Sequence, residues 1–206
     1  MNTYQPQGFR MLPQGVKHLL IINVLMYLIT IALESHGLYR ITNALALWPL
    51  GVGMFHVWQP VSYMFMHASI DHIFFNMFAL WMFGYILENY WGTQRFLVYY
   101  LVCGVGAAAV NMAIAALTGT VHPTVGASGA VYGILLAFGM MFPNERIYLY
   151  FLMPIKAKWF VIGYAAIELF EGVFHSNDGV AHFAHLGGML FGLLLILYWR
   201  RHPFRH

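Results

Sequence analysis

One serine in the sequence stands where nucleophilic chemistry is possible. Ser128 lies between Gly126-Ala127 and Gly129, at the beginning of an apolar stretch. The first N–H groups of a helix have no partner within that helix, so they can donate to an oxyanion that forms beside the hydroxyl. Small residues also allow helices to pack closely in a membrane. The segment therefore predicts either a nucleophile with its oxyanion donors or a close helix contact.

A histidine in a later apolar stretch could serve such a serine. His185 precedes Gly188 and Gly192, which are four residues apart and so share one face of a helix. Such a face lets another helix backbone approach closely. If that helix is the one that begins at Ser128, His185 can act as the general base for the hydroxyl. A proton relay and a buried structural histidine are the alternatives.

His72 and Asn76 form a third pair of polar residues within an apolar stretch. They are four residues apart, so both side chains point the same way. The Asn76 amide and a ring N–H of His72 can both donate to an oxyanion. The alternative is an ordinary hydrogen bond between helices.

Four histidines could instead gather around a metal ion: His67, His72, His182 and His185. Catalytic zinc sites usually add a carboxylate or a cysteine. The acids that we expect nearby, Asp71 and Asp178, belong at the membrane surface, and the single cysteine, Cys103, lies in an apolar run. We therefore expect no metal and no other cofactor, with a histidine–metal site as an alternative.

The elements that position these residues are predicted to span a membrane. Of 206 residues, 61% are hydrophobic and 8% are charged, against about 25% charged residues in soluble domains. Six apolar stretches suit six spans of about 20 residues. The prediction is an all-α membrane protein with one domain, 1–206, and a cytoplasmic leader, 1–15. The spans lie at about 16–33, 70–87, 96–117, 125–142, 159–174 and 180–199.

The connection between the first two spans, 34–69, is rich in aromatic residues. Such residues favour helices that lie in the membrane interface, and an apolar loop is the alternative.

Charge predicts the orientation of the spans. Nearly all basic residues lie in the leader, the tail and the connections of one parity, and Arg40 alone lies in a connection of the other parity. Both termini are then cytoplasmic and the number of spans is even. Spans two, four and six enter from the external side, so their polar residues meet at one depth. Because the basic residues form no face, we expect no nucleic-acid partner.

In this order the motifs resemble the rhomboid family of intramembrane serine proteases. They are His72 with Asn76, then Gly126-Ala127-Ser128-Gly129, then Ala184-His185 with Gly188 and Gly192. The resemblance covers nearly the whole chain. It implies a six-helix bundle of rhomboid type and a dyad without an acidic third member. Ser128 is the nucleophile of that dyad and His185 is its base.

The same resemblance implies roles for further residues. The glycine spacing selects His185 over His182 as the base, and Tyr132 takes the position of a ring that stacks on it. The Ser128 N–H, His72 and Asn76 would form the oxyanion hole, and His67 would bind water or support the site. Helix packing is assigned to Gly126, Gly129, Gly188, Gly192 and Glu88.

Gly84, Glu88 and Gly92 resemble a packing and capping element of the family near the cytoplasmic side. Separately, we expect Glu88 and Arg95 to form a surface pair that contributes little to stability. The first connection departs from the Trp-Arg pair of some members, because Arg40 follows Tyr39.

The predicted function is that of an intramembrane serine endopeptidase that cuts transmembrane segments near the external face. Its partners are transmembrane substrates and membrane lipid, and it needs no cofactor. No cleavable signal pattern opens the sequence, and a bacterial inner membrane is the expected location. The alternatives are a catalytically inactive relative that binds transmembrane helices, a histidine–metal membrane hydrolase, and a channel or transporter. The sequence predicts neither the physiological substrate nor the oligomeric state.

Overall fold

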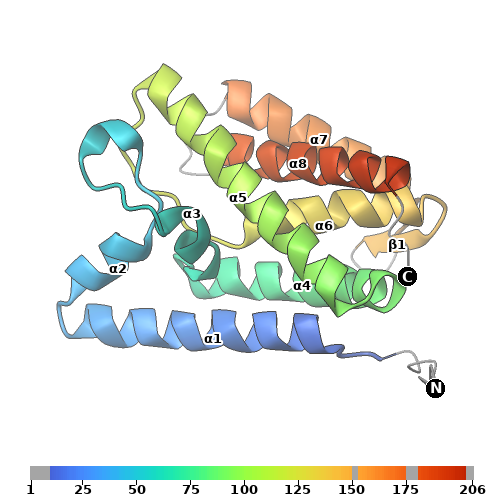
Figure 1. Ribbon diagram of the computed structural model, residues 1–206, viewed down its shortest axis with the longest axis horizontal. Coiled ribbons are helices and arrows are strands. Elements are labelled where there is room, and N and C mark those ends of the chain that lie inside the picture. Colours follow the sequence, from blue (N-terminus) through green and yellow to red (C-terminus); the bar gives the residue numbers. More distant parts are fainter. Residues whose placement is uncertain (1–9, 150–152, 175–180, 203–206) are drawn as a thin grey trace.

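Six helices of the computed structural model match the six apolar stretches (Figure 1). The structure describes residues 10–149, 153–174 and 181–202. Within these ranges the six helices are α1 (Gln14–Ser35), α4 (Ile70–Trp91), α5 (Thr93–Thr118), α6 (Ser128–Met141), α7 (Ala157–Phe174) and α8 (His182–Arg201). Of the described helices, α1, α4, α5 and α8 are long and apolar enough to cross a membrane, and α6 is a shorter apolar helix. The fold is therefore that of a mostly helical membrane protein.

Helix α6 occupies the centre of the bundle. It packs against α4, α5, α7 and α8, and Ala130, Ile134 and Ala137 on it are almost fully buried. By contrast, α1 lies at one edge beside α4 (Figure 1) and exposes large apolar side chains such as Leu25 and Leu28. An apolar surface of this kind suits lipid rather than water. The first turn of α1 and the last turn of α8 lie at the same end of the bundle (Figure 1).

A buried carboxylate fixes the beginning of α1. Glu88 is 2% exposed. Its Oε1 accepts hydrogen bonds from the Gly15 N–H (2.7 Å) and the Thr93 hydroxyl (2.6 Å), and its Oε2 accepts one from the Val16 N–H (2.7 Å). Helix α1 has no acidic residue in its own first turn, so Glu88 supplies the acceptor that its unpaired N–H groups need. The expectation that Glu88 lies at the surface beside Arg95 is wrong.

The connection between α1 and α4 contains short helices, as expected. They are α2 (Tyr39–Leu45), η1 (Leu50–Val52), α3 (Gln59–Ser62) and η2 (Tyr63–Phe65). The buried Gln59 side chain holds them together: it accepts from the Trp48 N–H (3.1 Å) and donates to the carbonyls of Ala44 (3.3 Å) and Met54 (3.0 Å). A bridge between Leu47 and Thr124 ties the connection to the segment that leads into α6.

The prediction of an all-helical protein is wrong between α6 and α7. There β1 (Arg146–Leu149) and β2 (Met153–Lys156) form an antiparallel pair, with Ile147 opposite Ile155. Ile147 is buried, whereas its neighbours Arg146 and Tyr148 are exposed. Strands of four residues carry too short an alternation to stand out among longer apolar runs.

Candidate active site

Ser128 is the first residue of α6, and the backbone before it is shaped by a glycine. Gly126 has φ 132°, a conformation that residues with a side chain rarely adopt, and its N–H donates to the Tyr63 carbonyl (2.9 Å). A Cβ atom on Gly126 would lie 2.7 Å from His72 Nε2. The glycine therefore allows the His72 ring to approach the loop that carries Ser128.

Helices α6 and α8 touch through their backbones, and this contact brings His185 to Ser128. A Cβ atom on Gly188 would lie 1.8 Å from the Gly129 carbonyl oxygen. Just before this contact, His185 Nε2 lies 2.8 Å from Ser128 Oγ. The close helix contact and the contact between Ser128 and His185 are thus both present, because the first creates the geometry of the second.

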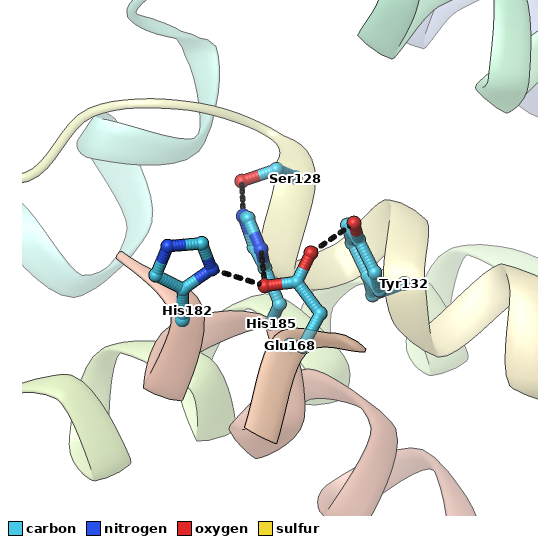
Figure 2. A network of polar contacts seen from close by, with 5 residues as sticks. All are labelled: Ser128, Tyr132, Glu168, His182 and His185. Carbon is cyan, nitrogen blue, oxygen red and sulfur yellow. Dashed lines mark hydrogen bonds and ion pairs between the residues drawn. The ribbon is translucent and has the colours of Figure 1, made fainter. Parts of the chain in front are cut away.

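A carboxylate from α7 completes the polar cluster (Figure 2). Glu168 Oε2 lies 2.8 Å from His185 Nδ1 and 2.7 Å from His182 Nδ1. Its other oxygen, Oε1, accepts a hydrogen bond from the Tyr132 hydroxyl. The family resemblance implied a serine and a histidine without an acidic third member, whereas the structure places the carboxylate of Glu168 beside His185. Of the two acids expected nearby, Asp71 is exposed and lines the same cavity as Ser128, and Asp178 lies outside the described residues. The expectation missed Glu168.

Tyr132 touches both the histidine and the carboxylate. Its ring is stacked on that of His185, with centroids 4.3 Å apart and planes 5° apart. It lies one helical turn after Ser128, so α6 provides both the hydroxyl and the ring that stacks on His185. The stacking that the family resemblance implied is therefore present, and the hydrogen bond to Glu168 is an additional role for the same residue.

The two candidate bases are distinguished by position. His185 contacts Ser128, whereas the ring of His182 lies with its centroid 6.3 Å from that of His185 and bonds to Glu168. The structure thus places His185 on the serine and His182 on the carboxylate.

His72 and Asn76 line the same cavity as Ser128 and His185. Ser69 caps α4 by accepting from the His72 N–H (3.1 Å), which fixes His72 in the first turn. The Ala68 N–H donates to His72 Nδ1 (3.4 Å), so a neutral ring carries its proton on Nε2, the atom nearest Gly126. One amide N–H of Asn76 donates a hydrogen bond to the His72 carbonyl (2.8 Å). Both residues therefore keep a donor N–H, and both line the cavity that Ser128 also lines.

His67 lies next to His72. It is 3% exposed, and its ring centroid is 5.0 Å from that of His72. Within the described part of the chain neither ring nitrogen has a hydrogen-bond partner. Burial, and secondarily the nearby His72 ring, lowers the pKa of His67 to about 3. The water-binding or supporting role of His67 stays a prediction.

The cavity has a volume of about 1340 Å³ and is mostly apolar. It follows α4 from His72 to Ile86, a length of about 21 Å, and follows α6 from Ser128 to Phe142, the residue just after the helix. Phe160 and Tyr164 of α7 complete one wall. The polar cluster thus lies at one end of an apolar groove.

Glu168, His182 and His185 could also hold a metal ion, because one ligand atom from each lies within 4.8 Å of the others. Two histidines and a glutamate are a known zinc ligand set. However, both Nδ1 atoms lie at hydrogen-bonding distance from the same carboxylate oxygen, and the second nitrogen of His185 lies on Ser128. This arrangement suits N–H donors on a carboxylate, so the expectation of no metal stays a prediction.

Comparison with known proteins gives a consistent result. Residues 54–202 match the model of the Rhomboid domain. The chain is 33% identical over 138 residues to the presenilin-associated rhomboid-like protein, mitochondrial, of Bos taurus, which covers 65% of this chain and 36% of that protein. It is 34% identical over 139 residues to RHOMBOID-like protein 6, mitochondrial, of Arabidopsis thaliana (67% and 42%). It is 33% identical over 135 residues to rhomboid protease GluP of Bacillus subtilis (66% and 24%). The matched region thus spans less than half the length of each of these relatives.

Proposed function

The chain belongs to the rhomboid family, and on that premise we propose that it is an intramembrane serine endopeptidase. Its substrates would be transmembrane segments of other proteins. The observation that carries the proposal is the 2.8 Å contact between Ser128 Oγ and His185 Nε2. At this distance a hydroxyl can donate a hydrogen bond directly to an imidazole nitrogen, which is the requirement for general-base activation.

The reaction is acyl transfer in two steps. Ser128 Oγ bonds to the carbonyl carbon of the scissile peptide while its proton passes to His185 Nε2. The carbon–nitrogen bond then breaks, and the imidazolium returns the proton to the leaving amine. A water molecule attacks the acyl-enzyme with the same histidine as base, and the Ser128 hydroxyl is restored.

Three donors would stabilise the negative oxygen that forms in each step. They are the N–H of Ser128 at the start of α6, the Nε2–H of His72 and the second amide N–H of Asn76. The first belongs to the helix turn whose N–H groups lack intrahelical partners. Loss of one such donor typically costs about 3 kcal/mol of transition-state stabilisation.

The groove favours an apolar, elongated substrate. Its length of about 21 Å and its apolar lining from α4, α6 and α7 suit a segment drawn from the bilayer rather than a soluble loop. A helical segment hides its carbonyls in its own hydrogen bonds, so the segment must unwind near Ser128. Helix-breaking residues near the cleavage position should therefore increase the cleavage rate.

We also propose one membrane domain with six spans and both termini in the cytoplasm. The six helices alternate in direction, and α4, α6 and α8 begin at the same end of the bundle (Figure 1). The positive-inside distribution supports an orientation in which these beginnings, with the active site, lie in the external half of the membrane. A bacterial inner membrane stays the proposed location.

Cleavage by purified protein tests the proposal. In liposomes with a model transmembrane substrate, Ser128→Ala and His185→Ala should each lose cleavage while keeping the wild-type melting temperature. Matched controls are Ser35→Ala and His18→Ala, which change exposed residues of α1. Retained cleavage by Ser128→Ala would remove the proposal. Binding of the substrate without cleavage by the wild type would instead favour the inactive helix-binding relative.

A further inference from the structure

Helix α7 buries a charged residue, Glu168, although the apolar residues next to it are exposed. Glu168 is 6% exposed, whereas its helix neighbours Ile167, Leu169 and Phe170 are exposed apolar side chains. Burial of a carboxylate is costly unless hydrogen bonds replace its water. Here the replacement comes from three groups on two other helices: Tyr132 on α6, and His182 and His185 on α8. An acid held in this way at a candidate active site calls for a role in the reaction.

The position of the carboxylate determines which nitrogen of His185 carries the proton. Glu168 Oε2 faces Nδ1 at 2.8 Å, and Ser128 Oγ faces Nε2 at 2.8 Å. Because a carboxylate only accepts, Nδ1 must be the donor, and a neutral ring then has its lone pair on Nε2. This is the form that can take a proton from the serine.

The carboxylate also favours the charged state of the histidine during the reaction. When Nε2 accepts the serine proton, the imidazolium remains 2.8 Å from the negative oxygen of Glu168. In a buried site that attraction is stronger than in water. Because the carboxylate is in place before the proton moves, it needs no reorganisation at that moment.

We propose that Glu168 is a positioning residue that completes a Ser128–His185–Glu168 triad in this chain. The inference rests on the proposed protease function and adds an acid to the serine and histidine that the rhomboid resemblance implied. Glu168 reaches the reacting atoms only through His185. It therefore orients the imidazole and stabilises its protonated form, and it does not touch the substrate.

Two neighbours keep the carboxylate in place. The Tyr132 hydroxyl donates to Oε1, and His182 Nδ1 lies 2.7 Å from Oε2. Together with His185 they hold both oxygens (Figure 2). Tyr132 therefore fixes His185 twice, directly through the stacked rings and indirectly through the acid.

Glu168→Gln is the direct test, because it keeps the shape and removes the charge. In a soluble triad the corresponding amide lowers kcat about 10⁴-fold by favouring the wrong tautomer. We expect kcat to fall at least about 100-fold, with KM within about twofold because no contact to substrate is lost. Glu168→Asp, which keeps the charge on a shorter side chain, should recover at least a tenth of the wild-type kcat. Glu34→Gln on α1 is the control.

The pH–rate profile separates orientation and charge from mere support of the fold. The groups that face His185 are Ser128 and Tyr132 from α6, Glu168 from α7, His182 from α8, and His72 from α4. Glu168→Gln removes the negative charge from this set of groups, so protonated His185 loses its stabilisation and the acidic limb of kcat/KM should move to lower pH. A purely structural role would lower the amount of folded enzyme and leave that limb in place.

Each outcome decides between the two proposals. If Glu168→Gln keeps kcat within threefold and leaves the pH limb unchanged, the triad is wrong, although loss of cleavage in Ser128→Ala still supports the protease. If Glu168→Gln fails to fold, Tyr132→Phe takes its place, and unchanged kcat and pH limb in that variant would also overturn the triad. If chelator abolishes wild-type cleavage and Zn²⁺ restores it, the three groups are metal ligands and the triad does not exist.

Discussion

The backbone contact between α6 and α8 allows a sharp prediction at Gly188. In Gly188→Ala the new Cβ would start 1.8 Å from the Gly129 carbonyl oxygen, whereas ordinary contact begins at 3.4 Å. The obstacle is backbone on both sides, so the helices must separate by up to about 1.6 Å. The 2.8 Å bond between His185 and Ser128 would then lengthen beyond hydrogen-bonding range.

The expected loss is large in activity and moderate in stability. A misplacement of about 1 Å can cost roughly 100-fold in rate, so we expect kcat to fall at least that far. Overpacking a close-packed contact costs about 1–3 kcal/mol of unfolding free energy. The matched control is Gly163→Ala, because a Cβ there meets nothing within 4 Å. It should keep activity and gain up to about 1 kcal/mol from the better helix former.

The assay compares cleavage of a transmembrane substrate with thermal unfolding for the wild type and both variants. If Gly188→Ala cleaves at the wild-type rate, the two helices need no direct backbone contact to form the site. The reasoning from glycine spacing to catalytic geometry would then be refuted.

Other changes test separate parts of the structure. Glu88→Ala should lower the unfolding free energy by about 2–4 kcal/mol, because it leaves the first N–H groups of α1 without their acceptor, and the activity per folded molecule should persist. Tyr132→Phe keeps the stacked ring and loses the bond to Glu168, so its kcat should lie between those of the wild type and Tyr132→Ala. In Gly126→Ala the new Cβ would press against His72 Nε2, so kcat should fall while KM changes little. An unchanged kcat would argue against His72 as an oxyanion donor. His67 stays neutral in the fold down to about pH 3, while the unfolded chain takes up a proton below about pH 6.5. Stability should therefore fall as pH drops through this window, by up to about 1.4 kcal/mol per pH unit, and His67→Leu should flatten the dependence seen in urea or thermal unfolding.

Much of the fold could be predicted because membrane helices leave long apolar runs. The stretch predicted at about 16–33 is α1, Gln14–Ser35, and the one at about 96–117 is α5, Thr93–Thr118. The polar starts of α4, α6 and α8 could be predicted to meet, since alternating spans put them at one depth. The short β1–β2 pair could not be predicted, because four residues on each side carry little periodic signal.

Glu168 shows where reasoning from motifs stops. Its partner His185 lies 17 residues later in the sequence and its partner Tyr132 lies 36 residues earlier, so no local spacing connects them. A signal was nevertheless present: two acids, Glu168 and Glu171, lie inside the apolar stretch 159–174. Ionisable residues within membrane helices usually mark a functional site.

Glu88 was misplaced for a related reason. The predicted partner, Arg95, was near it in sequence, whereas Gly15, which it caps, is 73 residues away.

The central claim is that His185 activates one serine, Ser128. Labelling with a fluorophosphonate, followed by mass spectrometry of the labelled peptide, tests it most directly, because only an activated serine reacts quickly. The adduct is expected on Ser128 in the wild type, and labelling should be lost in both Ser128→Ala and His185→Ala. An adduct on another residue, or undiminished labelling in His185→Ala, would contradict the claim.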